Sequence, residues 1–284
     1  MSENTKNTRA RLMNTPEDFK KFGINPNEVE LWEDGRRDDG RKGSFEWWYF
    51  DALLDDGTKI IITFFPEIQS KIKKSGDFPF CRIDITSPNG IMHTENFMCP
   101  AHESSFSKEQ CDIKIGKHRV TGDLKNYSIH IEPVNGLGAD LKLVSQGKPW
   151  RSGTSYFSFG NNEEKYFTWL CVAPKGEISG TITINGKSKT VKGFGYHDHQ
   201  WGNIMHMFAW NQWIWARQNF GDYNLVLFDL VSNQKFGYKH YPLCFIQDSE
   251  GNLILENTEG TKLEVIEEYF ENKLKKNIRK SLDI

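Results

Sequence analysis

Residue types that do acid–base chemistry gather in one ten-residue stretch, "GFGYHDHQWG", which runs from Gly193 to Gly202. His197 and His199 are two residues apart, so on a strand both side chains point to one face, as in metal-binding His-x-His pairs. Asp198 lies between them. These residue types fit three kinds of site: a metal centre, a buried network of hydrogen bonds, or an acid–base site.

The spacing of ligands argues against the metal centre. A catalytic metal usually needs three protein ligands. A cupin-like site would have a carboxylate three or four residues after the second histidine, where this chain has Asn203 and Ile204, although His206 is close. We therefore expect neither a metal nor another cofactor. The second interpretation, a buried structural network, stays open because buried His, Asp and Tyr side chains can hydrogen-bond to one another.

Neighbouring aromatic segments would enclose this cluster in an apolar chamber. Alternate side chains of "EWWYF" and "WNQWIWARQ", together with two residues of the cluster, are expected to bind substrate there: Glu46, Trp48, Tyr49, Tyr196, His197, Trp213, Trp215 and Arg217. Loss of solvation in such a chamber raises the pKa of a carboxylic acid, and aromatic faces stabilise a developing cation. The cluster is thus read as an acid–base site.

The segments that must position these residues read as strands. From Glu46 onward, short β-branched or aromatic runs alternate with turn sequences, in one series up to Gly147 and a second from about Tyr156. "ISGTITINGKSKTVKG" predicts a hairpin that turns at Asn185–Gly186. Many short, evenly spaced strands are typical of sandwiches and barrels. We expect an all-β chain of two successive antiparallel units, divided around residues 145–160.

The two ends of the chain differ from this pattern. Residues 1–40 are polar and contain a short helical signal in "TPEDFKKF". Near the other end, apolar residues follow a helical stripe, and Thr261 with Glu264 would form a capping box. The stripe consists of Leu263, Ile266, Phe270, Leu274 and Ile278. We expect a helix there, although "KLEVIEEYF" also suits a strand.

Composition narrows the class of protein. The 36 Lys and Arg nearly balance 38 Asp and Glu in 284 residues, which argues against a nucleic-acid partner. Five scattered cysteines without a Cys-x-x-Cys pair suit reduced thiols in a cytoplasmic protein. No apolar run reads as a signal peptide or a membrane span. Peripheral contact with a membrane and the oligomeric state stay open.

Three segments together resemble a known family. "EWWYFDALLDDGTKIIITFF", "PKGEISGTITINGKSKTVKGFGYHDHQWGN" and "WIWARQNFGDYNLVLFDL" are similar to carotenoid 1,2-hydratases (hydroxyneurosporene synthases). These belong to a lipocalin-like superfamily that includes kievitone hydratase-like enzymes and fungal Diels–Alderases. The resemblance runs from about Gly43 to at least Asn257, and the combination of EWWYF with GYHDHxWG makes it specific.

The resemblance implies two consecutive lipocalin-like β-barrel domains, here residues 41–150 and 151–284 after an extension of residues 1–40. It leaves open how the second barrel closes. It also implies a hydrophobic isoprenoid or polyene substrate and cofactor-independent addition of water to a carbon–carbon double bond. The family's catalytic positions match His199, Trp201 and Asp229, but Leu227 replaces a tyrosine found two residues before that aspartate.

Our leading hypothesis is a hydratase for a terpenoid or carotenoid-like substrate. Asp198 or Asp229 would protonate the alkene, and His199 would position water or accept its proton. Trp201, Trp213 and Trp215 would face the cation. On a regular strand Asp198 points away from His199, so the acid is undecided. A pericyclase or isomerase for a polyene and a non-catalytic carrier of a hydrophobic ligand are the alternatives.

Overall fold

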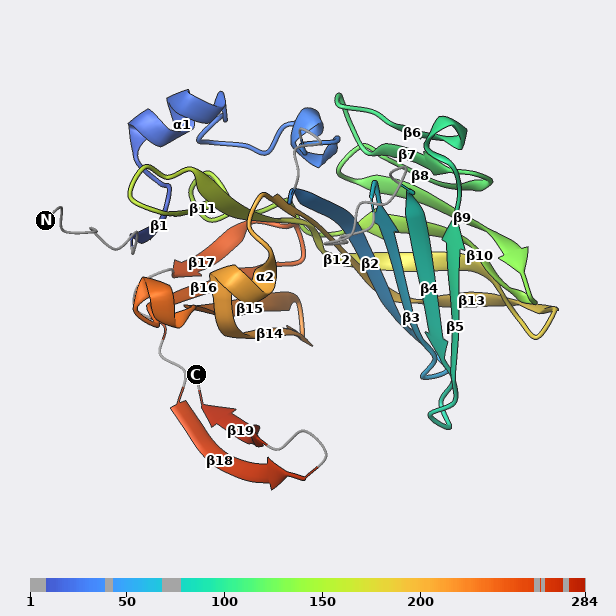
Figure 1. Cartoon of the computed structure of the whole chain (residues 1–284). Helices are drawn as coiled ribbons and strands as arrows, with labels where there is room; N and C mark the ends of the chain where they lie inside the picture. Colours follow the sequence, from blue (N-terminus) through green and yellow to red (C-terminus); the bar gives the residue numbers. More distant parts are fainter. Residues whose placement is uncertain are drawn as a thin grey trace, which may run out of the picture.

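Antiparallel strands form most of the computed structural model, which describes residues 9–38, 43–67, 78–257, 261, 264–272 and 276–283. The described strands form one large curled sheet, a four-stranded sheet and a two-stranded hairpin. The large sheet curls into a half-barrel, and the four-stranded sheet lies beside it (Figure 1). The expected all-β class is confirmed.

The large sheet follows the order β5-β4-β3-β2-β13-β12-β10-β9-β8-β7-β6, with β11 and β1 paired beyond one end of β12. Its strands are β1 (Ala10–Leu12), β2 (Phe45–Leu54), β3 (Lys59–Phe65), β4 (Phe80–Thr86), β5 (Met92–Met98), β6 (Ser104–Phe106), β7 (Asp112–Ile115), β8 (His118–Gly122), β9 (Asn126–Val134), β10 (Leu137–Ser145), β11 (Tyr156–Phe159), β12 (Lys165–Ile184) and β13 (Lys187–Gly202).

The long β12–β13 hairpin sits at the centre of this sheet. Its turn has a positive φ at both Asn185 (51°) and Gly186 (75°), which is the conformation that an Asn-Gly pair favours in a two-residue hairpin. The predicted hairpin is therefore confirmed. The polar cluster lies on β13 between β12 and β2, and Asp198 pairs with Tyr49 while His199 pairs with Trp48.

The second sheet packs on the outer face of β12 and β13. It consists of β14 (Trp210–Phe220), β15 (Tyr223–Ser232), β16 (His240–Gln247) and β17 (Leu253–Asn257). One hydrophobic core fills the half-barrel, and a second core, rich in aromatic rings, joins the two sheets. β12 and β13 thus belong to the first sheet although they fall within residues 151–284, and the division into two domains at residue 150 stays a prediction.

Short helices connect the strands: α1 (Pro16–Phe22), η1 (Leu31–Asp34), η2 (Ala101–Glu103), α2 (His206–Ala209) and η3 (Gln234–Phe236). The predicted N-terminal helix is confirmed as α1, with Thr15 and Asp18 in a capping box. Among the described residues, no helix is long and apolar enough to cross a membrane.

The helix predicted near the C-terminus is wrong. β18 (Glu264–Glu271) pairs with β19 (Lys276–Asp283) as an antiparallel hairpin, while Leu263 and Leu274 lie outside the described residues. "VIEEYF" contains β-branched and aromatic residues that favour strands, and cross-strand pairing outweighs the helical spacing.

Close contact between β13 and β2 yields a prediction at Gly193. A Cβ there would lie 2.3 Å from the Leu53 carbonyl oxygen and 2.6 Å from the Leu54 Cα. We expect Gly193→Ala to lower the free energy of unfolding by about 1–3 kcal/mol, because the backbones must separate. Urea denaturation measures this. Lys192→Ala, at the exposed neighbouring position, is the control, and equal stability of the two variants would contradict the close contact.

Candidate functional site

The two faces of β13 carry separate polar clusters. His197, His199 and Trp201 point into the half-barrel, where Trp201 belongs to the core. Asp198 and Tyr196 point to the other face, toward the second sheet. The alternation of a regular strand is thus preserved, and Asp198 does not share the face of the histidines.

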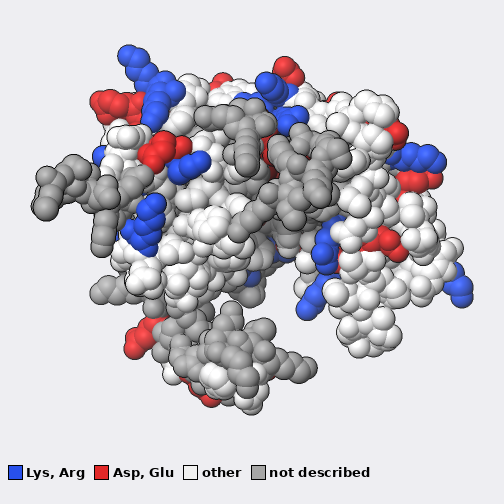
Figure 2. Space-filling view, in the orientation of Figure 1, with Lys and Arg blue, Asp and Glu red and all other residues white. Residues whose placement is uncertain are grey.

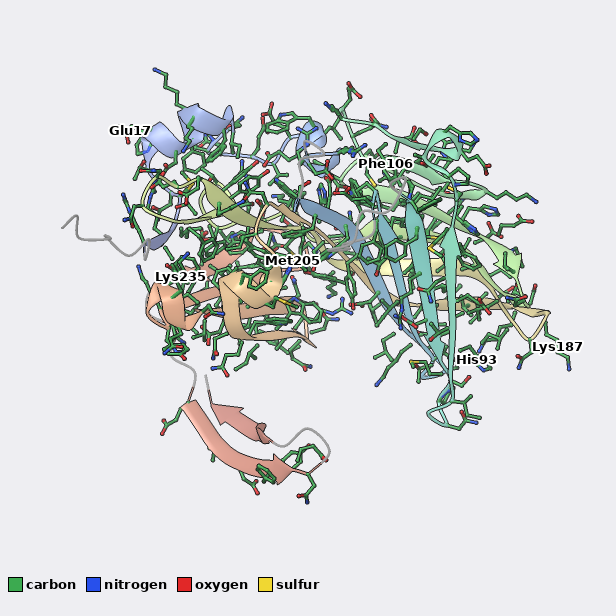
Figure 3. All side chains as sticks on the ribbon, viewed as in Figure 1. Glu17, His93, Phe106, Lys187, Met205 and Lys235 are labelled. Carbon is green, nitrogen blue, oxygen red and sulfur yellow. The ribbon has the colours of Figure 1, made fainter. Side chains whose placement is uncertain are left out.

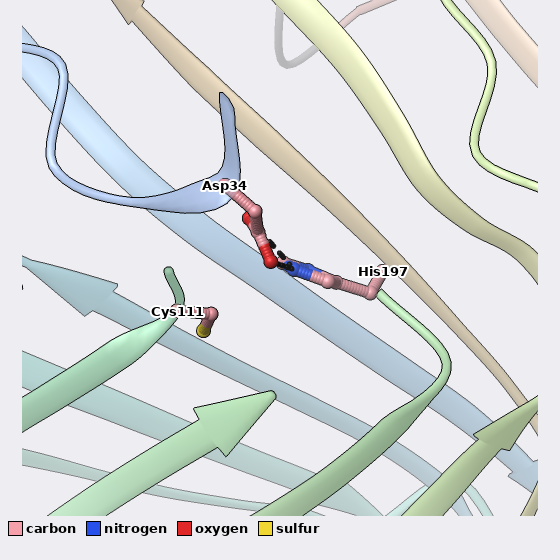
Figure 4. A group of neighbouring side chains, drawn as sticks. All are labelled: Asp34, Cys111 and His197. Carbon is pink, nitrogen blue, oxygen red and sulfur yellow. Dashed lines mark hydrogen bonds and ion pairs between the residues drawn. The ribbon is translucent and has the colours of Figure 1, made fainter. Parts of the chain in front are cut away.

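His197 is fully buried and bonded at both ring nitrogens (Figure 4). Its Nε2 lies 3.1 Å from Asp34 Oδ2, and its Nδ1 lies 3.0 Å from the Tyr49 carbonyl oxygen. The Tyr127 hydroxyl also donates to Asp34, at 2.8 Å. Both ring nitrogens therefore lie within hydrogen-bond distance of oxygen atoms, which fixes the orientation of the ring.

His199 is held in the same way. Its Nε2 lies 2.8 Å from Glu46 Oε1, and its Nδ1 lies 3.2 Å from the Glu33 carbonyl oxygen. The ring also packs against the rings of Trp48 and Trp201, and each of their centroids is 4.6 Å from its own. The two histidines therefore fix η1 and the residues after it over the half-barrel.

One group on this face has donor types that could hold a metal: Asp34, Cys111 and His197, whose ligand atoms lie within 4.8 Å of one another (Figure 4). The Asp34 carboxylate already accepts hydrogen bonds from Tyr127 and His197. Burial raises the pKa of the Cys111 thiol well above its usual value, and a thiol ligand must first lose its proton. We interpret the group as a buried hydrogen-bond network.

A cavity of about 370 Å³ lies on the other face of β13, between the two sheets. Its lining residues come from β2, β13, α2, β14 and β15: Trp47, Tyr49, Asp198, Gln200, His206, Trp213, Trp215, Phe228 and Leu230. Four of the residues predicted from sequence meet here, namely Tyr49, Asp198, Trp213 and Trp215. Five further predicted site residues lie on the opposite face of the sheet, with the histidines: Glu46, Trp48, His197, His199 and Trp201.

Asp198 is the acidic group of this cavity and is only 3% exposed. Its Oδ2 accepts hydrogen bonds from Trp169 Nε1 at 3.2 Å and the Tyr196 hydroxyl at 3.0 Å. Gln200 Nε2 donates to Oδ1 at 3.1 Å. Burial raises the pKa of Asp198 above its usual value even though these three donors favour the carboxylate. Asp198 thus keeps its proton to higher pH than an exposed aspartate.

His206 is the basic group of the same cavity and is not among the site residues predicted from the sequence. Its ring lies against the rings of Phe45, Trp47 and Phe167, with centroids 4.9 to 5.0 Å away. Burial lowers the pKa of His206 to about 4, so the imidazole is neutral above that pH. Asn203 fixes the turn before it by bonding the Tyr166 N–H and the Glu164 carbonyl.

Arg217 lies beside the cavity and links the two sheets. Its guanidinium pairs with Asp51 of β2 and lies 4.7 Å from the centre of the Tyr196 ring. Burial raises the pKa of Asp51 to about 6 despite this ion pair. Arg217 and Asp51 line a smaller adjoining cavity that shares Tyr49 with the first.

Asp229 lies away from the cavity. Its neighbours on β15, Phe228 and Leu230, line the cavity, so Asp229 points to the opposite face of the second sheet. Its Oδ2 lies 3.2 Å from His240 Nδ1, and its buried Oδ1 has no hydrogen-bond partner within the described ranges. The structure therefore separates the two aspartates that the sequence offered as acids.

A larger cavity of about 550 Å³ lies between the N-terminal segment and the β16–β17 hairpin. Charged side chains on its wall are already paired: Arg151 bonds Glu33, and Lys148 bonds Asn252. Among the described residues that line this cavity, no acid has a raised pKa and the aromatic rings do not form a chamber. The Asp198 cavity is consequently the better candidate for catalysis.

The buried histidine network predicts a stability effect. His197→Ala removes one partner of a fully buried hydrogen-bonded pair, and we expect a loss of about 1–3 kcal/mol because the buried Asp34 carboxyl loses a hydrogen-bond partner. His102→Ala, with a side chain 80% exposed, should change stability by less than about 0.5 kcal/mol. Guanidinium denaturation compares them. Equal stability of the two variants would contradict the pair.

Comparison with known proteins agrees with this architecture. Residues 36–281 match the family described as AttH-like. The chain is 25% identical over 249 residues to the quinolone epoxide rearrangement protein penF of Penicillium thymicola, covering 78% of this chain and 64% of that protein. It is 24% identical over 225 residues to asqO of Emericella nidulans, also a quinolone epoxide rearrangement protein, covering 75% and 60%. The chain spans less than two thirds of the length of these curated relatives.

Solved structures share the fold. An AttH protein of Nitrosomonas europaea superposes with a TM-score of 0.66 at 16% identity, covering 90% of this chain and 80% of that one. CghA with Sch210972 gives 0.57 at 15%, covering 82% and 68%. Kievitone hydratase of Nectria haematococca gives 0.56 at 12%, covering 90% and 76%. The lipocalin-like fold is confirmed, and the narrower likeness to carotenoid hydratases stays a prediction. With 36–281 matched, the chain belongs to the AttH-like family.

Proposed function

We propose that this protein is an acid–base enzyme that adds water to, or removes it from, a carbon–carbon double bond of a hydrophobic small molecule. The observation that carries the proposal is the cavity between the sheets. In it burial raises the pKa of Asp198 and lowers that of His206, so that the surroundings favour the uncharged form of both groups. These opposite shifts widen the range of pH in which the acid still carries its proton and the base is free to accept one.

Asp198 would supply the proton. Two donors occupy its Oδ2, whereas Oδ1 accepts from Gln200 alone among the described residues, which leaves a position there for a proton. This proton moves from Oδ1 to one alkene carbon, and the π electrons form the new C–H bond. The resulting cation on the adjacent carbon faces the rings of Trp213 and Trp215.

His206 would then act as the base. Water forms a C–O bond to the cationic carbon, and its surplus proton passes to the neutral imidazole. The proton returns to Asp198 through water, which restores both groups. The reverse sequence, with His206 as acid, eliminates water from an alcohol. No net charge or redox change occurs in either direction.

The cavity limits the size of the substrate. Its volume of about 370 Å³ is near the lower end of the range of about 300–1,000 Å³ that is usual for ligand pockets. A terpenoid-sized molecule, or one end of a longer polyene, suits it better than a whole carotenoid. The hydrophobic walls support a terpenoid or polyene substrate.

Rearrangement of an epoxide is the second candidate. Two curated relatives are named as quinolone epoxide rearrangement proteins. Opening an epoxide also begins with delivery of a proton, in that case to the ring oxygen, and Asp198 would serve as the donor. The two reactions differ in their product: hydration incorporates an oxygen atom from water, whereas rearrangement of an epoxide does not.

Two aspartates form a matched test. Substrates are sought by incubating terpenoids, prenylated aromatics and aryl epoxides in heavy-oxygen water, with mass spectrometry of the products. We expect Asp198→Asn to lower kcat/KM by about 10²–10⁴-fold and Asp229→Asn to change it by less than about threefold, since only Asp198 lines the cavity. Full activity of Asp198→Asn would refute the acid. If the protein bound one of these compounds tightly and released it chemically unchanged in every assay, it would be a carrier and not an enzyme.

The pKa shifts predict how the rate depends on pH. Catalysis needs His206 neutral and Asp198 protonated, so kcat/KM should rise as pH increases through about 4 and fall as pH passes the raised pKa of Asp198. In His206→Gln the lower limb should vanish while the upper limb remains. The measurement is kcat/KM against pH for both proteins. If His206→Gln kept the same loss of activity at low pH as wild type, the assignment of His206 as the base would be wrong.

A further inference from the structure

The cavity that contains Asp198 continues along β2 toward an ion pair. Tyr49 lines this cavity and also the adjoining one, which has a volume of about 250 Å³ and includes Asp51 and Arg217 in its wall. Asp51 follows Tyr49 by two residues on β2, so both side chains point to the same face of the sheet. The two cavities thus meet at Tyr49 and together offer an apolar and a polar compartment.

The pair of Arg217 and Asp51 is partly buried. Many charged side chains on the face shown in Figure 2 stand at the surface beside an opposite charge. The Arg217 and Asp51 side chains, in contrast, are only 26% and 10% exposed. Arg217 lies on β14, the strand that follows α2, whose start is marked by Met205 in Figure 3. The central carbon of its guanidinium lies 4.7 Å from the centre of the Tyr196 ring and 5.6 Å from that of Trp215, which holds the group at the wall of both cavities.

Much of the hydrogen-bonding capacity of Arg217 is unused. A guanidinium group has five N–H donors. The bond to Asp51 is made by Nη2, and the Arg217 side chain makes no other hydrogen bond within the described part of the chain. Its Nε and Nη1 are therefore free to donate to an oxygen atom of a ligand. Apolar pockets commonly orient their ligands through a few polar groups of this kind.

The acceptor that suits this compartment is a neutral oxygen atom. Asp51 already balances the charge of Arg217, and burial raises the pKa of Asp51 to about 6 although Arg217 opposes this change. The surroundings thus disfavour even one carboxylate. A second anion would lie beside Asp51 and would lose its own hydration. A carbonyl oxygen accepts from the guanidinium without adding a charge.

The pairing of β2 with β13 sets the separation of the two compartments. Tyr49 pairs with Asp198, and Asp51 pairs with Tyr196. Asp198 and Asp51 therefore lie two residue steps apart along the strands, which is about 7 Å at a rise of about 3.4 Å per residue. A ligand that reaches both needs a similar separation between its acceptor oxygen and its reacting carbon.

We propose that Arg217 binds a neutral carbonyl oxygen of the substrate, while the carbon–carbon double bond of the same molecule lies beside Asp198. The substrate is then an unsaturated hydrophobic ketone or amide and not a pure hydrocarbon. This inference rests on the proposed function, because it takes the Asp198 cavity as the substrate site. Asp51 holds the guanidinium in place, and Tyr49 lies between the two ends of the ligand.

Equilibrium binding of three matched probes to the full chain tests the proposal. Geranylacetone has a ketone a few bonds away from an alkene. Geranylacetic acid has a carboxylate at the same place, and the matching hydrocarbon has a methylene group instead of the carbonyl. Quenching of tryptophan fluorescence at neutral pH reports binding, because Trp213 and Trp215 line the cavity. Wild type should bind the ketone at least about threefold more tightly than the carboxylate, since the carboxylate meets Asp51.

The ratio of ketone affinity to hydrocarbon affinity isolates the contribution of Arg217. Arg217→Met should lower this ratio at least about tenfold, because a hydrogen bond from a charged donor is lost. Arg217→Met/Asp51→Asn should show the same decrease without leaving Asp51 as an unpaired charge. The matched control is Arg82→Met/Asp84→Asn, since Arg82 Nε bonds Asp84 Oδ2 at 2.7 Å on β4 and neither residue lines either cavity. It should keep the wild-type ratio, and thermal unfolding verifies that each variant is folded.

Four results would overturn the proposal. These are no binding of geranylacetone to wild type, tighter binding of geranylacetic acid than of the ketone, an unchanged ratio in folded Arg217→Met/Asp51→Asn, and an equal decrease in the control. A purely structural tie between the sheets would leave the ratio unchanged. The measurement needs no turnover, and Asp198→Asn should keep the wild-type ratio. Binding that depends on Arg217, together with full activity of Asp198→Asn, would therefore refute the catalytic acid and support the inference on Arg217.

Discussion

Successive side chains in the second half of β13 point to opposite faces of a sheet that is buried there on both sides, so each polar group must be hydrogen-bonded on its own face. His197 and His199 meet carboxylates of the N-terminal segment and of β2 inside the half-barrel. Within the described part of the chain, Asp198 meets neutral donors alone on the other face. One strand consequently holds a structural network and a candidate catalytic acid back to back.

The different chemistry of the two faces follows from their partners. The histidine face pairs each imidazole with a carboxyl group, so its buried polar groups are hydrogen-bonded and hold the segment around η1 in place. The Asp198 face has no cation in direct hydrogen-bond contact with the acid in the described chain, and desolvation then favours the neutral carboxyl. His206 is kept neutral by the same loss of water. A chamber of this kind suits reactions that pass through a cation, because the aromatic rings stabilise it.

Local signals in the sequence predicted much of the architecture. The Asn185–Gly186 turn, the strand-like runs and the aromatic segments were read correctly, because turn geometry and alternation depend on neighbours in the chain. The partner of His197, in contrast, is Asp34, 163 residues away, and no spacing rule links them. His206 acquires its role only when α2 and β14 close the cavity over β13. The C-terminal residues show the limit of periodicity, since pairing between β18 and β19 overrides a helical stripe.

The central claim is that the fold keeps Asp198 protonated where an ordinary aspartate, with a pKa of 3.8, has lost its proton. Infrared difference spectra between wild type and Asp198→Asn, recorded as pH increases, measure this directly through the C=O stretch of a protonated carboxyl. Our account predicts that this band persists well above the pH at which exposed aspartates lose it. Disappearance of the band at the ordinary pKa of aspartate would contradict the account.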